Sequence, residues 1–172
     1  MPSVAAKLPS RSKLEITIKV SEEYIRADDL ARLVWATNVL YELLASIFIF
    51  DSKPFADGKL QSLPEDSVLR IAKMWSGSDA GFSFLGVDKV LGQLGKGIGE
   101  IRDWREKKKQ LRERTEQEHE KTTQMRLENL ARAMDIYDKL KNMAPGDRER
   151  FLEMMRATVS EIEQNRNELL PM

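Results

Sequence analysis

The amino-acid sequence predicts an α+β fold that is mostly helical: a small β-α-β-β-α head, a long charged helix and a C-terminal antiparallel helical hairpin. Three observations support this prediction. Apolar residues alternate over a short N-terminal segment, which is typical of a strand. Apolar residues recur at three-four spacing over most of the remaining chain, which is typical of helices. Charged side chains make up 33% of the 172 residues and aromatic ones 7%, a composition that favours helix-rich proteins.

The head, residues 13–101, is predicted to begin with a strand and a helix. The preceding residues 1–12 contain no apolar run and are expected to form a loose tail. Apolar side chains then alternate with polar ones, at Leu14, Ile16, Ile18 and Val20. This pattern predicts a strand with one buried face. A helix is expected over residues 30–50, and its apolar band is wider than one stripe, which indicates burial on more than one side.

The rest of the head is predicted to be a hairpin and a second helix. Residues 51–66 are rich in Pro, Asp, Ser and Gly and are expected to form a loop. Strands are predicted over residues 68–75 and 82–85, with a Gly- and Ser-rich turn between them. The next helix is expected over residues 87–101. These elements make a three-stranded sheet with two helices on one face.

Residues 102–124 are predicted to form a solvated helical neck. This stretch holds only two clearly apolar residues, Trp104 and Leu111, and it contains neither proline nor glycine. Opposite charges stand four residues apart, as in the pair Lys109 and Glu113, and such pairs stabilise an exposed helix. The neck is therefore expected to hold two apolar modules apart.

Residues 125–172 are predicted to form an antiparallel helical hairpin. The sequence Ala144-Pro145-Gly146 breaks the helical pattern, and a return helix is expected over residues 147–170. A helix of about 24 residues spans roughly 36 Å. It can cover the preceding helix only back to about Lys121, so most of the neck is expected to stay uncovered within one copy.

Self-association is predicted because a lone helix pair buries too little apolar surface to be stable. Two hairpins could pack as a four-helix bundle, and the head could pair through its first helix and its glycine-bearing helix. Gly92, Gly95 and Gly99 lie on one side of that second helix, where small residues allow another backbone to come close. The remaining expected interface residues are apolar: Leu40, Leu44, Ile47, Leu127, Leu130, Met134, Tyr137, Phe151, Met155 and Ile162.

Composition and motifs give little support for an enzyme. The chain has 28 basic and 28 acidic residues, so no net field draws it to nucleic acid or to an acidic membrane. It has no cysteine, which excludes disulfides and thiol chemistry and fits a cytoplasmic protein. The glycines around Gly95 fit neither the P-loop nor the dinucleotide-binding pattern. No cofactor and no metal are therefore expected.

One catalytic alternative rests on the only histidine. Arg114 and His119 have the Arg-x4-His spacing used by a superfamily of small helical ribonucleases. In such a site, arginine would hold phosphate and histidine would act as a general base. The pair is predicted to lie on the charged neck, although the families that it resembles bury this motif in a cleft. A metal-independent ribonuclease is therefore the alternative to a binding protein.

Two further alternatives concern nucleic acid and membranes. Residues 102–114 carry seven basic and three acidic side chains and could contact a nucleic-acid backbone. The acids are interleaved, however, and a solvated face is the usual meaning of such a run. The segment 33–50 has a single charge, Glu42, and reaches the lower limit for a membrane-spanning helix. A charge near its middle and the need of the first strand for a packing partner favour a core helix.

One stretch of the chain resembles a recurrent type of bacterial protein of uncharacterised activity. It is the run VLRIAKMWSGSDAGFSFLGVDKVLGQLGKGIGEIRDWREKKK, and the resemblance covers about residues 13–124. Proteins of this type have a β-α-β-β-α head followed by a charged helical tail, which implies a bacterial cytoplasmic setting. Together, these observations lead us to expect a non-enzymatic homo-oligomeric scaffold or adaptor that binds a protein partner.

Overall fold

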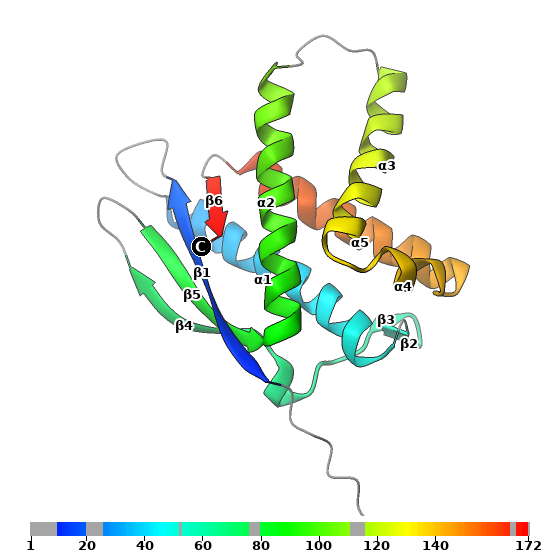
Figure 1. The fold of residues 1–172 in the computed structure, drawn as a ribbon, viewed down its shortest axis with the longest axis horizontal. Coiled ribbons are helices and arrows are strands. Elements are labelled where there is room, and N and C mark those ends of the chain that lie inside the picture. Colours follow the sequence, from blue (N-terminus) through cyan, green and yellow to red (C-terminus); the bar gives the residue numbers. More distant parts are fainter. Residues whose placement is uncertain are drawn as a thin grey trace, which may run out of the picture.

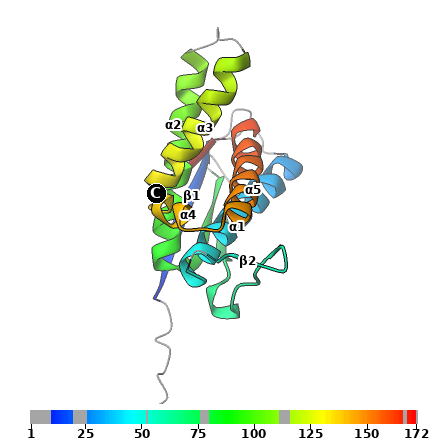
Figure 2. The same cartoon turned by 90° about the vertical axis from the view of Figure 1, so that its right-hand side faces the viewer.

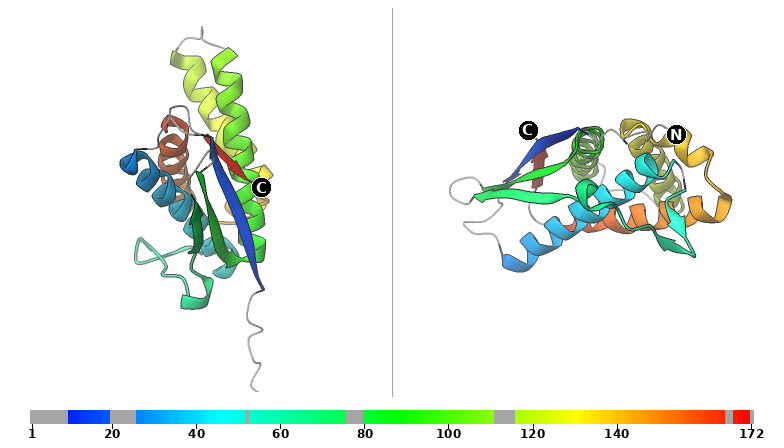
Figure 3. Two further views of the ribbon diagram at one scale, coloured as in Figure 1. Left: turned by 90° about the vertical axis from the view of Figure 1, so that its left-hand side faces the viewer. Right: turned by 90° about the horizontal axis from the view of Figure 1, so that it is seen from below.

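The computed structural model describes residues 10–19, 26–51, 53–75, 80–110, 116–165 and 168–171. The predicted α+β class is confirmed, with antiparallel strands and a majority of helix (Figure 1). The strands form one layer and the helices pack behind it. Figure 3, left, shows the strands in front and the long helices on the far side. Among the described residues, no helix covers the other face of the sheet.

The main sheet has the strand order β4-β5-β1-β6, and neighbouring strands run antiparallel. The four strands are β1 (Arg11–Lys19), β4 (Arg70–Trp75), β5 (Ala80–Val87) and β6 (Glu168–Pro171). Leu14 pairs with Phe84 and Ile16 with Phe82, which places these four side chains on the face that the helices cover. The alternation at Leu14, Ile16 and Ile18 thus marks the buried face, as predicted.

Two small elements connect the first helix to β4. Strands β2 (Phe55–Ala56) and β3 (Lys59–Leu60) form a hairpin, and η1 (Glu65–Ser67) is a short 3-10 helix. The hairpin turn consists of Asp57 and Gly58, which both have positive φ angles, of 48° and 73°. Two-residue turns of this kind favour Asp-Gly because glycine adopts positive φ without steric cost.

The helical layer is built from five helices among the described residues. They are α1 (Ala27–Ile49), α2 (Asp88–Gln110), α3 (Glu116–Ala133), α4 (Tyr137–Lys141) and α5 (Pro145–Gln164). In Figure 2, α1 and α5 lie side by side, while α2 and α3 form a second pair. The wide apolar band of α1 is explained by this arrangement, because α1 packs against α5, α2 and the sheet.

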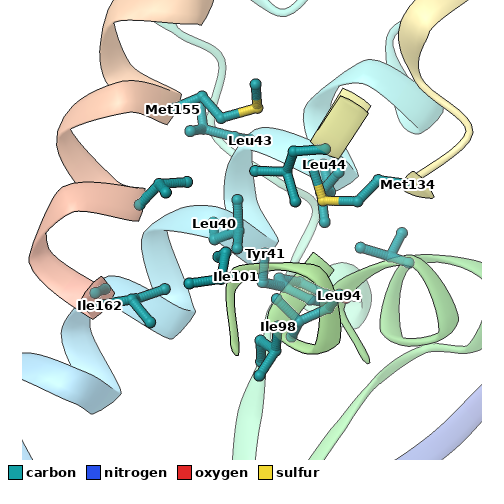
Figure 4. Close-up of a cluster of buried hydrophobic side chains, with 14 of the residues drawn as sticks. Leu40, Tyr41, Leu43, Leu44, Leu94, Ile98, Ile101, Met134, Met155 and Ile162 are labelled. Atoms are coloured by element: carbon teal, nitrogen blue, oxygen red, sulfur yellow. The ribbon is translucent and has the colours of Figure 1, made fainter. Parts of the chain in front are cut away.

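The head and the C-terminal hairpin share one hydrophobic core. Figure 4 shows Leu40 from α1, Leu94 from α2 and Ile162 from α5 pointing into the same cluster. Met134, at the end of α3, and Met155, on α5, belong to it as well. The sequence predicts two apolar modules held apart by a polar rod. The structure instead joins residues 13–101 and 125–165 in a common interior, because α5 folds back onto α1 rather than onto α3 alone.

The predicted neck is a turn-back rather than a straight spacer. Helix α2 ends at Gln110 and α3 begins at Glu116 and returns beside α2 (Figure 1). Trp104, expected on a solvated helix, is only 5% exposed, and its Nε1 donates a hydrogen bond to Glu100 Oε1 at 2.8 Å. The pattern of charges predicted helix correctly, but it could not show where the helix reverses. Leu111 lies outside the described residues.

The C-terminal segment departs from the prediction in two places. The three-four spacing predicts helix through Lys141, yet α3 ends at Ala133 and Asp135 has a φ of 54°, which separates α3 from α4. The last helix begins at Pro145, two residues before the predicted start, and it ends at Gln164 rather than near residue 170. Residues 168–171 form β6 instead. Their backbone N–H and C=O groups find hydrogen-bond partners along the edge of β1, which a local sequence pattern does not reveal.

Candidate interaction surface

Most side chains predicted to contact another copy are buried within one chain. Tyr137 is partly buried, and the other predicted apolar positions are at most 9% exposed: Leu40, Leu44, Ile47, Leu127, Leu130, Met134, Phe151, Met155 and Ile162. Their contacts are with each other across α1, α3 and α5. The assignment of these residues to an interface between copies is therefore corrected: they form the intramolecular core.

The three glycines predicted to form one contact surface, Gly92, Gly95 and Gly99, do not share one environment in the structure. A Cβ at Gly92 or Gly99 would meet nothing within 4 Å, so both positions are open to the outside. Gly95 faces β1, with Leu14 Cδ1 at 3.5 Å from such a Cβ. The close approach inside the chain occurs at Gly97, where a Cβ would lie 2.5 Å from Met134 Sδ. A contact between copies at Gly92 and Gly99 stays a prediction.

The catalytic alternatives gain no support from the described residues. Arg114 and the side chain of His119 lie outside them, and the helical backbone of α3 includes position 119. The described part of the chain contains no group of three or more His, Cys, Asp or Glu side chains arranged to hold a metal ion. Of the basic run 102–114, Arg102 pairs with the neighbouring Asp103 at 3.0 Å.

Helix α1 is long and apolar enough to cross a membrane by length and composition. Its 18-residue apolar window is 56% buried inside the protein, however. The Tyr41 hydroxyl donates a hydrogen bond to Ser67 O at 2.8 Å and accepts one from Val87 N–H at 3.0 Å. Burial raises the pKa of Tyr41. These contacts tie α1 to η1 and β5 as the predicted core helix.

A polar cavity of about 300 Å³ lies between the start of α1 and the end of α5. Its wall is held together by its own polar groups. Asn165 Nδ2 donates to Asp29 O at 3.0 Å, and Arg32 lies 3.8 Å from Glu161. The lining of the cavity carries two basic side chains, Arg26 and Arg32, and three acidic ones, Asp28, Asp29 and Glu161.

The large apolar side chains that are exposed among the described residues are Trp35, Ile71, Met74, Leu85 and Met125. Two of them, Ile71 and Met74, lie on one strand at the edge of the sheet. We define the β4 edge surface as Arg70, Ile71, Lys73, Met74 and Trp75. Strand β4 is the outermost strand next to β5, so no other described strand pairs with its second side. Ile71 is 46% exposed and Met74 is 55% exposed. An edge strand presents unpaired N–H and C=O groups, which makes it a template for another extended chain.

The two exposed apolar residues extend the buried face of the sheet. Ile71 stands opposite Phe84 and Met74 opposite Phe82, and both phenylalanines are buried under the helices. Residues three apart would normally point to opposite faces of a strand. The register shift between Ile71 and Lys73 inserts one extra residue, and this bulge brings Ile71 and Met74 to the same face.

The opposite face of β4 is cationic and aromatic. Arg70 stands opposite Leu85 and Lys73 opposite Ser83, on the sheet face without helices. Trp75 lies over Gly81, where a side chain would collide with the indole and come within 2.6 Å of Ile16 O. Glycine at this position therefore leaves the space that the Trp75 ring occupies. Strand β4 thus has one apolar face and one basic face.

Sequence reasoning predicted this strand but not its position in the sheet. The segment 68–75 has the composition of a strand, and that expectation is confirmed by β4. Whether a strand is central or at an edge depends on pairing with distant segments, which the local pattern does not contain. The sequence did contain one signal of the bulge in this strand. Ile71 and Met74 are three residues apart, whereas apolar residues on one face of a regular strand are two apart.

Comparison of the chain with protein-family models, with curated proteins and with solved structures finds no match. The function is therefore inferred from the surface of the molecule itself.

Proposed function

We propose that this protein is a non-catalytic scaffold or adaptor that binds a protein partner through the β4 edge surface. The observation that carries the proposal is the exposed apolar pair Ile71 and Met74 on strand β4, whose second side is paired with no other described strand. Strand addition to a sheet edge is a common way to bind an extended peptide, in which the backbone provides hydrogen bonds and alternate side chains provide specificity.

The energetic argument favours a partner at this edge. Burying a large apolar side chain is worth about 1.5–3 kcal/mol, so covering the exposed halves of Ile71 and Met74 contributes about 1 kcal/mol each. Backbone hydrogen bonds along the strand add to this contribution. Trp35, on α1, and Met125, on α3, are exposed as well, but neither lies on a strand edge.

Homo-oligomerisation remains part of the proposal, but the contact between copies is expected at other residues than those predicted from the sequence. The buried hairpin residues are unavailable to a second copy, while the β4 edge surface and the open side of α2 at Gly92 and Gly99 are accessible. A dimer is therefore expected through the open side of α2, which leaves the β4 edge surface to the partner protein. The ribonuclease alternative stays a prediction, because Arg114 and the side chain of His119 lie outside the described residues.

The test is a charge substitution on the apolar face of β4. The double variant Ile71→Glu/Met74→Glu is expected to fold, because both side chains are largely exposed, and to lose binding by at least tenfold. The matched control is Met125→Glu, since Met125 is 60% exposed on α3, outside the sheet. The measurement is capture from the source cells, followed by identification of the partner and calorimetry with the purified partner and each variant.

Two results would contradict the proposal. Equal affinity of the wild-type protein and the double variant for the purified partner would show that β4 is not the binding surface. Failure to recover a specific partner, together with a monomeric mass for the wild-type protein by light scattering, would remove the scaffold function altogether. Circular dichroism of each variant verifies that the fold is retained.

A further inference from the structure

We infer that the occupant of the β4 edge surface is an extended acidic segment of a partner protein. This segment would carry apolar residues on one face and carboxylates on the other, and it would add to the sheet as a fifth strand. The inference rests on the proposed function and gives the partner its chemistry. It is argued from the two faces of β4 and from the groups that surround each of them.

The apolar face defines half of the occupant. Ile71 and Met74 continue the surface formed by Phe84 and Phe82 beyond the helical layer. In neighbouring strands, directly opposite side chains on one face have Cβ atoms about 4.5–5.5 Å apart. Apolar side chains of an added strand would therefore contact Ile71 and Met74 directly and remove them from water.

The basic face defines the other half. Arg70 and Lys73 are the charged residues of β4, and no acidic residue lies on this strand. Among the described residues, Lys73 has no carboxylate within ion-pair distance. The nearby Glu15, on β1, already pairs with Lys13. Carboxylates of an added strand would stand opposite Arg70 and Lys73, where opposite charges stabilise a cross-strand pair.

The side-chain pattern of β4 disfavours a second copy as the occupant. An antiparallel pair of two β4 strands centred on Lys73 places the two lysines directly opposite each other, and like charges in this position destabilise pairing. A pair centred on Ile71 places Arg70 opposite Ala72 and aligns only residues 70–72 of β4, and a pair centred on Met74 aligns only residues 73–75. Lysine and a bulge are features that commonly protect an edge strand from pairing with a second copy. They do not prevent pairing with an acidic strand, because its carboxylates would attract the lysine.

The experiment uses the full-length protein and two synthetic peptides. The first is fluorescein-labelled Glu-Val-Glu-Val-Glu-Val-Glu, and the second has lysine at every glutamate position. Fluorescence polarisation is expected to show at least tenfold tighter binding of the glutamate peptide, with affinity that falls as salt rises. Hydrogen exchange with the bound peptide is expected to slow at the amides of residues 70–75 and not in α3.

Charge reversal provides the specificity test. The variant Arg70→Glu/Lys73→Glu is expected to lose the glutamate peptide and to bind the lysine peptide at least tenfold more tightly than the wild-type protein does. The matched control is Lys107→Glu/Arg148→Glu, which changes the net charge equally at exposed positions on α2 and α5. This control is expected to retain the wild-type preference.

The outcomes separate this inference from the proposed function. Absence of glutamate-peptide binding, or equal binding of both peptides, would overturn the acidic occupant. If partner capture still depended on Ile71 and Met74, the scaffold function would stand without it. A dimer of the wild-type protein that dissociates in Ile71→Glu/Met74→Glu would identify a second copy as the occupant and would also overturn the inference.

Discussion

At the scale of single residues, buried polar contacts fix how the helical layer sits on the sheet. The Tyr41 hydroxyl both donates to Ser67 O and accepts from Val87 N–H inside the core. A buried polar group that loses its partner costs more than the hydrogen bond contributed when it was made. Tyr41 is therefore a sensitive position, although its sequence neighbourhood suggested only an apolar helix.

Replacing Tyr41 with phenylalanine tests this contact. The variant leaves Ser67 O and Val87 N–H without this partner, so the free energy of unfolding is expected to fall by about 1–3 kcal/mol. Urea denaturation followed by circular dichroism measures the change. Tyr137→Phe is the control, because the described contacts of Tyr137 are those of its ring with Arg132 and Lys141. An equal loss in both variants would contradict the role given to the Tyr41 hydroxyl.

The pKa of Tyr41 adds a second readout for the same variant. Burial raises this pKa above the ordinary value of 10.0. The neutral hydroxyl is thus favoured in the folded state. Its contribution to the free energy of unfolding is complete below pH 10 and is lost as the pH rises through the folded pKa. The alkaline loss of stability in the wild-type protein is expected to be smaller in Tyr41→Phe.

At the scale of elements, the junction between α3 and α4 is held by a charged contact to α2. Asp135 adopts a φ of 54°, and its Oδ2 accepts hydrogen bonds from Gln93 Nε2 at 2.9 Å and Lys96 Nζ at 3.0 Å. The hydrogen bond from Lys96 is the largest of the effects that lower the pKa of Asp135. The chain turns here because this residue type tolerates positive φ and finds two donors on the neighbouring helix.

Asp135→Asn separates charge from backbone conformation, since asparagine also accepts positive φ. A carboxyl whose pKa is lowered in the folded state contributes stability above its unfolded pKa, and this contribution is lost as the pH falls through the folded pKa. The stability difference between wild-type protein and variant is therefore expected to be largest at neutral pH and to shrink below pH 3.8. Thermal melts across pH 2–7 measure it.

Asp138→Asn is the matched control for this pH series. Asp138 lies on α4, is 92% exposed, and stands 3.8 Å from Lys141 in a surface ion pair. Such pairs contribute little, so its removal is expected to change the melting temperature by less than Asp135→Asn does at neutral pH. A pH-independent difference for Asp135→Asn would contradict the charged contact between α2 and the α3–α4 junction.

At the scale of the whole molecule, a continuous core replaces the two modules that the sequence suggested. Leu130 and Ile162 belong to the same cluster as Ile16 and Leu40. One core is expected to unfold in one cooperative step, because neither the head nor the hairpin is stable once the other is lost. Denaturation curves from tryptophan fluorescence and far-UV circular dichroism are expected to coincide. Two separate transitions would restore the two-module organisation.

Much of the fold could be predicted from particular residues because their signals are local. Alternation at Leu14, Ile16 and Ile18 predicted β1 and its buried face, and the break at Ala144-Pro145-Gly146 predicted the start of the last helix to within two residues. The burial of Trp104 and the formation of β6 could not be predicted, and the cause is the same in both cases. Each depends on a distant segment of the chain, which covers the indole of Trp104 or provides the strand edge with which β6 pairs.

The sequence by itself determined the class of the fold, the order of most elements and the side of each element that avoids water. These properties follow from periodicity and turn chemistry, which act over a few residues. The tertiary structure decided which apolar residues remain exposed to solvent. The apolar residues of the C-terminal helical hairpin are buried against α1, whereas Ile71 and Met74 are exposed at the edge of the sheet. That outcome depends on long-range pairing, because an apolar side chain is available to a partner only when its own chain has nothing to place over it.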